Sequence, residues 1–76
     1  MIKRSLSLYG HRTSLALEPE FWAVIDLAVE ANGKSFARFI RDLDDARMAE
    51  KSQNNLASYL RVWVLRHVQN TRSPKT

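Results

Sequence analysis

Hydrophobic and polar residues alternate near the start of the chain and then recur at helical spacing. Leu15 and Leu17 share the odd positions with Thr13, while the even positions around them hold polar or small side chains. This period of two predicts a strand over 12–17 with one face in water. Pro19 cannot donate to a strand ladder but suits the first turn of a helix, so the strand is expected to end just before it.

The residues before this strand have the opposite parity. Ile2, Leu6 and Leu8 occupy even positions, so one continuous strand cannot keep both apolar sets on the same face. Gly10 is the residue able to supply a turn or bulge between the two sets. Residues 1–11 are therefore expected to form an extra short strand or a basic arm, and the ordered strand is the interpretation we favour.

Three amphipathic segments follow and predict helices over 19–32, 35–46 and 55–69. Gly33 ends the first, Ser35 opens the second, and Asn54 or Asn55 caps the third. The predicted apolar face of the first helix consists of Phe21, Val24, Ile25, Leu27, Ala28 and Ala31. A charged connection is expected from Asp44 to Gln53, and the polar residues 71–76 are expected to be a disordered tail.

The length of the chain favours a single domain and association between chains. A core made from 76 residues is small, and without cysteine no disulfide can reinforce it. The strand over 12–17 also lacks an assured partner, and unpaired strand amides are costly unless a second molecule pairs with them. Both observations predict a homodimer. The side chains assigned to its core or dimer contact are Thr13, Leu15, Leu17, Phe21, Ile25, Phe39, Ile40 and Trp63.

The charges are unevenly distributed along the chain. All eight acidic residues lie between Glu18 and Glu50, so the net charge is +3 over 1–17, −3 over 18–53 and +4 over 54–76. Basic ends can meet phosphates, although they also serve solubility alone. The longest apolar run is too short to span a membrane, and no signal-peptide core is apparent, so a cytoplasmic protein is expected.

The order of these elements resembles the ribbon-helix-helix fold of the Arc and MetJ repressors. The resemblance covers 12–43 in general pattern. Two runs, Gly10 to Trp22 and Asn55 to Val62, are similar to a bacterial subfamily of ribbon-helix-helix proteins with an additional C-terminal helix. The resemblance implies a mostly α-helical homodimer in which two chains pair their strands into a ribbon that enters the DNA major groove.

The resemblance also implies which residues meet DNA. By position, Arg12, Ser14 and Ala16 would face the base edges, while the backbone amides of Ser35 and Phe36 would hold a phosphate. Basic residues near an N-terminus commonly contact phosphates without reading sequence, which is the role expected of Lys3 and Arg4.

Other chemistry finds little support in the sequence. His11 and His67 are far apart without cysteine partners, and Asp42, Asp44 and Asp45 lack the glycine-bearing loop of a cation site, so no metal or cofactor is expected. The three acids are expected to form a solvated helix end. Trp22 and Trp63 could stack on bases but are more typical of core or dimer contacts. No catalytic motif appears, so an enzyme is not expected.

Two classes of function remain. The first is a DNA-binding homodimeric transcriptional regulator. The second is a protein-interaction module or antitoxin-like protein that keeps the fold without sequence-specific DNA reading and uses its third helix to engage a partner.

Overall fold

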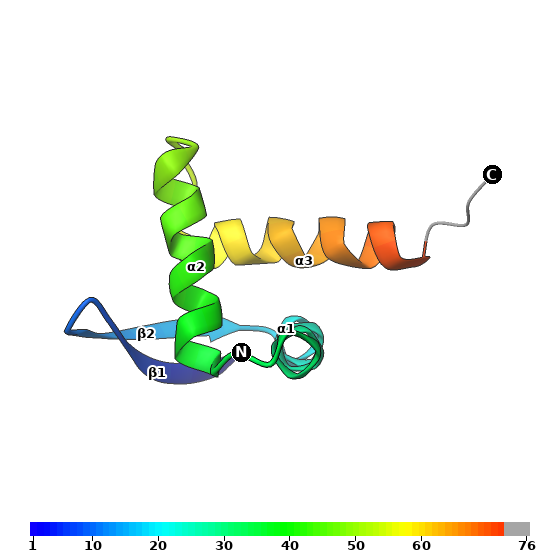
Figure 1. Ribbon diagram of the computed structural model, residues 1–76, viewed down its shortest axis with the longest axis horizontal. Coiled ribbons are helices and arrows are strands. Elements are labelled where there is room, and N and C mark those ends of the chain that lie inside the picture. Colours follow the sequence, from blue (N-terminus) through cyan, green and yellow to red (C-terminus); the bar gives the residue numbers. More distant parts are fainter. Residues whose placement is uncertain (73–76) are drawn as a thin grey trace.

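The computed structural model describes residues 1–72, which form a β-hairpin followed by three helices (Figure 1). The predicted fold class, mostly α-helical with a short β-ribbon, is confirmed. The elements are β1 (Ile2–Leu8), β2 (His11–Leu17), α1 (Pro19–Asn32), α2 (Phe36–Ala49) and α3 (Leu56–Arg72).

The hairpin explains the switch of parity along the first 17 residues. Tyr9 and Gly10 both have positive φ, 52° and 78°, which is the backbone of a two-residue type I′ turn. Leu8 is therefore opposite His11, and every even position of β1 meets an odd position of β2. The apolar sets of the two strands thus share one face. Residues 2–8 form an ordered strand, which is the alternative favoured from the sequence, and this strand pairs with β2 along its full length on one edge.

The inner face of the hairpin packs on the helices and forms one core with them. Leu17, Ile25, Ile40 and Leu60 are fully buried, and Trp22 is only 2% exposed. Among the residues whose side chains the structure describes, the buried hydrophobic ones are Leu6, Leu8, Leu15, Leu17, Trp22, Ile25, Ala28, Phe39, Ile40, Leu60 and Val64. Of the other residues assigned to the core from sequence, Thr13, Phe21 and Trp63 are half-buried.

Strand β1 is attached to α1 by two polar contacts and a ring contact. The indole Nε1 of Trp22 donates to the carbonyl of Ile2 at 2.8 Å, and the terminal nitrogens Nη1 and Nη2 of Arg4 donate to the two carboxylate oxygens of Asp26 at 2.8 and 2.9 Å. The Arg4 guanidinium also lies 4.5 Å from the centre of the Trp22 ring. The hydrogen bonds from Arg4 hold the pKa of Asp26 below its usual range, against a smaller opposing effect of burial.

Helix ends follow the local signals of the sequence. Helix α1 has the predicted bounds, and Gly33 closes it with a φ of 71° while its amide donates to the Val29 carbonyl at 3.1 Å. Ser35 caps α2 by accepting from the Arg38 amide at 3.1 Å. Asn55, one of the two predicted caps, opens α3 by accepting from the amide of Ser58 at 2.9 Å.

Helix α2 differs from the prediction at its C-terminal end. It continues to Ala49, and Asp44, expected in a solvated helix end, is only 8% exposed. Arg47 contributes to the burial of Asp44, because its guanidinium donates to Asp44 at 3.0 Å and also to the Asn54 carbonyl at 3.2 Å. Arg47 thus ties the last turn of α2 to the connection that follows.

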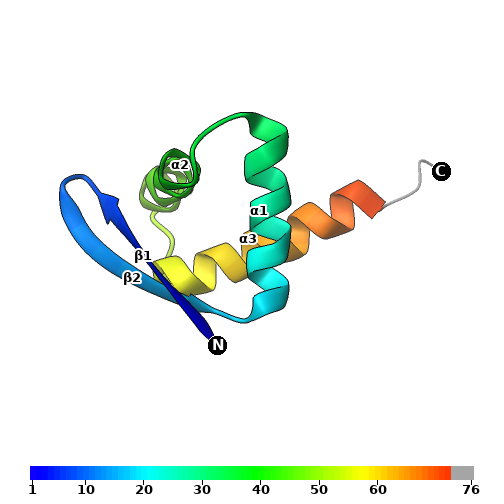
Figure 2. The same cartoon turned by 90° about the horizontal axis from the view of Figure 1, so that it is seen from below.

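Helix α3 passes beside α1 and extends beyond it (Figures 1 and 2). It also contacts α2 and β2, and it supplies Leu60 and Val64 to the core. Residues 71 and 72, assigned to the disordered tail from sequence, belong to this helix, and 73–76 lie outside the described residues. The prediction that Leu27 of α1 is on the core face is wrong, since the side chain is 66% exposed.

Candidate nucleic-acid interface

The outer face of the hairpin is a polar ribbon. Because the strands alternate, Lys3, Ser5 and Ser7 of β1 lie on the face opposite the buried leucines, and their partners on β2 are Ala16, Ser14 and Arg12. All are exposed except Ala16, which is half-buried. We call this set of six residues the outer face. It contains Arg12, Ser14 and Ala16, which the resemblance assigns to base edges, and it places a residue of β1 next to each of them.

The outer face is positively charged and offers several hydroxyl groups. Neither Lys3 nor Arg12 forms an ion pair with any side chain in the range 1–70. Ser5 and Ser14 face each other across the ladder with their hydroxyl oxygens 3.5 Å apart. The face can therefore present two cations and three hydroxyl groups to one ligand, with no carboxylate among its residues.

Arg4 lies on the other side of the strand from its neighbour Lys3. Its guanidinium is bonded to Asp26 and packs against the rings of Trp22 and Phe36, at 4.5 and 5.3 Å from their centres. The bonds to Asp26 raise the pKa of Arg4 above its usual value. Its charge is thus already compensated within the chain.

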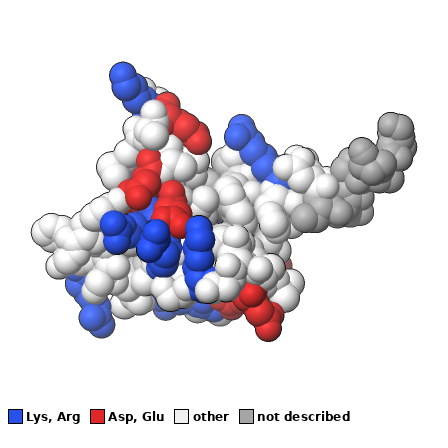
Figure 3. All heavy atoms as spheres, in the orientation of Figure 1, with Lys and Arg blue, Asp and Glu red and all other residues white. Residues whose placement is uncertain are grey.

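A second group of cations flanks β1 on helix α2. Arg38 and Arg41 line a hollow of ≈ 430 Å³ between the helix and the tip of the hairpin, together with Ser7, Tyr9, Gly10 and Ala37. The guanidinium of Arg41 lies 4.8 Å from the centre of the Tyr9 ring, which orients it beside the turn. In Figure 3, Lys and Arg side chains gather over the N-terminal part of α2, and Asp and Glu lie next to them farther along the helix.

The acidic neighbours compensate only part of this charge. Asp42 pairs with Lys34 at 2.7 Å and with Arg38 at 3.2 Å, and the bond from Lys34 is the main reason that the pKa of Asp42 is lowered. Arg41 has no ion pair with the side chains of residues 1–70. The start of α2 therefore keeps a positive balance, in addition to the positive end of its helix dipole.

Ser35 and Phe36 are at the start of α2, as the sequence predicts. The Ser35 hydroxyl is used internally as the cap, whereas the first amides of a helix have no acceptor within the helix. Phe36 packs its ring against Trp22 at 5.7 Å, so only its backbone can reach a ligand.

The two tryptophans considered for base stacking pack against other side chains instead, and the acidic residues do not form a metal site within the described residues. Trp22 is in the core, and Trp63 packs against Phe39 at 5.4 Å and stacks on His67 at 4.7 Å. In the part of the chain that the structure describes, no three His, Asp or Glu side chains are grouped to hold a metal ion. No helix in that part is long and apolar enough to cross a membrane.

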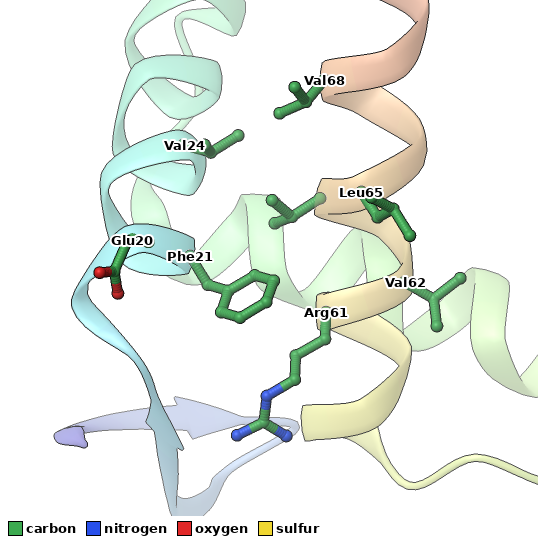
Figure 4. A pocket seen from close by; sticks show the side chains of 8 residues that line it. Glu20, Phe21, Val24, Arg61, Val62, Leu65 and Val68 are labelled. Carbon is green, nitrogen blue, oxygen red and sulfur yellow. The ribbon is translucent and has the colours of Figure 1, made fainter.

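An apolar groove on a different part of the surface separates α1 from α3 (Figure 4). Its lining is almost entirely hydrocarbon, with charged groups only at one end, and none of the outer-face residues takes part in it. It is chemically unlike the hairpin surface, and it adjoins the helix that the sequence analysis associates with a protein partner.

Sequence reasoning missed Ser5, Ser7 and Arg41 as parts of the charged surface. Once residues 2–8 are assigned to a strand, the alternation of apolar and polar positions places Ser5 and Ser7 on the outer face. The signal for these two residues was therefore present in the sequence. Arg41 depends on where α2 packs against β1, for which residue spacing gives no indication.

Comparison with known proteins identifies the family. The family model described as the ribbon-helix-helix domain matches residues 1–68, which include both strands and most of α3. Comparison with curated proteins and with solved structures found no match. Members of the matching family are typically DNA-binding regulators or antitoxins and are generally non-enzymatic. The match covers nearly the whole chain, and the chain belongs to the ribbon-helix-helix domain family.

Proposed function

We propose that this protein is a DNA-binding homodimeric transcriptional regulator whose outer face lies in the DNA major groove. The observation that carries the proposal is the concentration of cations and hydroxyl groups, with no carboxylate among them, on one face of a two-stranded ribbon. The major groove is about 12 Å wide and admits a two-stranded ribbon. Here both strands come from the same chain, so a single hairpin has the required shape.

The side chains of the outer face suit base edges. Arg12 can donate two hydrogen bonds to guanine, and Ser14 can donate to or accept from several bases. Ala16 offers an apolar contact to a thymine methyl group. Because Ser5 and Ser7 lie opposite Ser14 and Arg12 in the ladder, they extend the polar surface across the width of the ribbon.

Phosphates of the DNA backbone would be contacted by residues at one end of the outer face and on α2. Lys3 lies on the outer face near the start of β1, while the amides of Ser35 and Phe36 lie at the start of α2 and Arg41 lies farther along that helix. Contacts of this kind position a protein on DNA without reading its sequence. Arg4 is not included among them, because Asp26 already compensates its charge.

The test separates base contacts from phosphate contacts. A preferred site is first selected from random DNA with the purified protein, and affinities are then measured by fluorescence anisotropy at several salt concentrations. Arg12→Ala should lose about 1–3 kcal/mol on the preferred site and relax base choice there. Lys3→Ala should weaken binding to all sequences about equally and lower the salt slope by roughly one unit, because one fewer counterion is released from the DNA.

A matched control is Lys51→Asn, which removes an exposed charge at the end of α2 far from the hairpin. Lys51 has a φ of 56°, and asparagine tolerates that conformation better than alanine. Binding should be unchanged in this variant. If Arg12→Ala and Lys3→Ala also leave DNA retention at low salt unchanged, the hairpin is not the DNA surface.

That negative result would support the alternative, a protein-interaction module or antitoxin-like protein. The observation that favours this alternative is the apolar groove beside α3. A protein that binds through this groove alone should show no salt-dependent retention on nonspecific DNA.

A further inference from the structure

The hollow between the tip of the hairpin and α2 brings polar and cationic groups together from three parts of the chain. We call it the hairpin-tip hollow; it is lined by Ser7, Tyr9, Gly10, Ala37, Arg38 and Arg41. Its volume of ≈ 430 Å³ lies within the range of about 300–1,000 Å³ that is usual for small-ligand sites. None of these lining residues is acidic, so the lining has a positive balance.

Both arginines of the hollow keep donors free for a ligand. Arg38 donates from its Nε to Asp42 at 3.2 Å, whereas its two terminal nitrogens have no hydrogen-bond partner within residues 1–70. Arg41 follows three positions later, on the same side of α2, and its guanidinium has neither an ion pair nor a hydrogen bond in that range. Guanidinium groups with unused donors match the oxygen atoms of a phosphate group.

Tyr9 occupies a position where tyrosine is unusual. Its φ is 52°, and a turn of this type prefers asparagine, aspartate or glycine there, because a bulky side chain strains that backbone conformation. The residue is 52% exposed, and its hydroxyl has no hydrogen-bond partner within residues 1–70. Its ring lies 4.8 Å from the guanidinium of Arg41, which holds that charge beside the hollow. The turn therefore has an aromatic residue that supports an arginine in place of a residue that fits the turn better.

We propose that the hairpin-tip hollow binds one phosphate group, with Arg38 and Arg41 donating to its oxygen atoms and the Tyr9 hydroxyl as a further donor. The inference goes beyond the proposed function, because phosphate binding here needs neither a reading surface nor a dimer. The same chemistry accepts the phosphate of a small phosphorylated molecule or a phosphate of the DNA backbone.

The number of donors and the charge favour phosphate over a carboxylate as the anion. A phosphate monoester carries a charge of about −1.5 to −2 and three strong acceptor oxygens, whereas a carboxylate has a single charge and two oxygens. Two guanidinium groups and a hydroxyl can satisfy three acceptors at once. Asp42 compensates Arg38 only in part, because it bonds a single nitrogen of that guanidinium.

The first measurement is a titration of the full chain with inorganic phosphate at constant ionic strength, followed by ¹H–¹⁵N NMR. We expect saturable shifts of the Gly10 and Ala37 amides and of the Arg41 Nε signal. Arg41→Gln should weaken phosphate binding at least about 10-fold, because it removes the uncompensated charge of the hollow. Arg66→Gln is the matched control, since Arg66 is exposed on α3, has no ion pair within residues 1–70 and lies outside the hollow. Its phosphate affinity should equal that of the wild type.

Two changes of Tyr9 separate ligand binding from the stability of the turn. Tyr9→Phe removes only the hydroxyl and should weaken phosphate binding about 3-fold or more. Tyr9→Asn suits the positive φ, so it should not lower the melting temperature, but it should also weaken phosphate binding. Shifts that stay linear in phosphate concentration overturn the inference, as does equal weakening by Arg41→Gln and Arg66→Gln. Unchanged phosphate affinity in Tyr9→Asn overturns it too.

A second arm with nonspecific duplex DNA identifies the source of the phosphate. If DNA supplies it, Arg41→Gln should weaken binding to all sequences and lower the salt slope by roughly one unit, while Arg66→Gln should change neither. If Arg41→Gln abolishes phosphate binding and leaves DNA affinity unchanged, a small phosphorylated molecule is the source.

These outcomes are separable from those of the proposed function. Saturable phosphate binding that depends on Arg41, in a protein that binds no DNA, keeps this inference and rejects the regulator. DNA binding that depends on Arg12, without saturable phosphate binding, rejects this inference and keeps the regulator.

Discussion

Replacing Trp22 with phenylalanine tests how the first strand is held in the fold. The indole is 2% exposed, and its Nε1 hydrogen bond to the Ile2 carbonyl joins α1 to the start of β1. Phenylalanine removes that bond, which contributes about 1 kcal/mol, and about 1 kcal/mol of buried apolar surface. Because Ile2 is 47% exposed as a residue, we expect water to replace the lost donor at its carbonyl and add no larger penalty. A loss of about 2 kcal/mol corresponds to a fall in melting temperature of roughly 8–16 °C for a domain of this size.

Thermal unfolding followed by circular dichroism measures the loss, and hydrogen exchange of the β1 amides shows where it acts. Trp63→Phe is the matched control, because Trp63 is half-buried and has no hydrogen bond from its indole within the described residues. The control should lose clearly less stability and leave exchange in β1 unchanged. Equal losses in the two variants, or unchanged exchange of the β1 amides in Trp22→Phe, would refute the role assigned to this contact.

Three further changes test separate parts of the fold. Asp26→Asn removes the pair with Arg4, which contributes at most about 1 kcal/mol because both groups are partly in water. The pKa of Asp26 is lowered by folding, so this contribution should be present at pH 7 and should shrink as the pH falls below about 3.9 and through the lowered pKa. Urea unfolding at pH 7 and at pH 2 measures it, and a difference between the two proteins that does not shrink at the lower pH contradicts it. Gly33→Ala should cost about 1 kcal/mol through the positive φ alone, because a Cβ there meets no atom within 4 Å, and Gly33→Asn should cost less in the same urea assay. Leu60→Ala should cost about 2–5 kcal/mol in thermal unfolding, since the side chain is fully buried, and a loss below about 1 kcal/mol would show that α3 does not complete the core.

The elements that sequence reasoning predicted well are those fixed by neighbouring residues. The bounds of α1 follow from Pro19 at its start and Gly33 after its end, and both signals act within one helical turn. The switch of apolar parity required a turn at Gly10, which is where the hairpin turns. Alternation also gave the outward direction of Arg12 and Ser14 without any knowledge of tertiary contacts.

The features that it missed depend on residues far apart in the chain. Strand β1 is fixed by contacts of Ile2 and Arg4 with α1, about twenty residues later, and a sequence pattern does not reveal such contacts. Burial of Asp44 depends likewise on Arg47 reaching the connection before α3. The contact with Asp26 also changes what Arg4 is expected to do. Sequence reasoning assigns Arg4 to a phosphate contact, but Asp26 compensates its charge inside the chain.

The hairpin changes what a dimeric regulator of this kind would recognise. A ribbon shared between two chains lies on the two-fold axis, so a dimer has one ribbon and reads one continuous palindrome. Here each chain has both strands of its own ribbon, so the proposed dimer would carry two reading surfaces related by the axis. Such a dimer should select an inverted repeat whose half-sites are separated by about 10–10.5 base pairs or a multiple of it. Selection from a random DNA pool distinguishes the two arrangements, and a single short palindrome with no second half-site would show that the strands pair between chains on DNA.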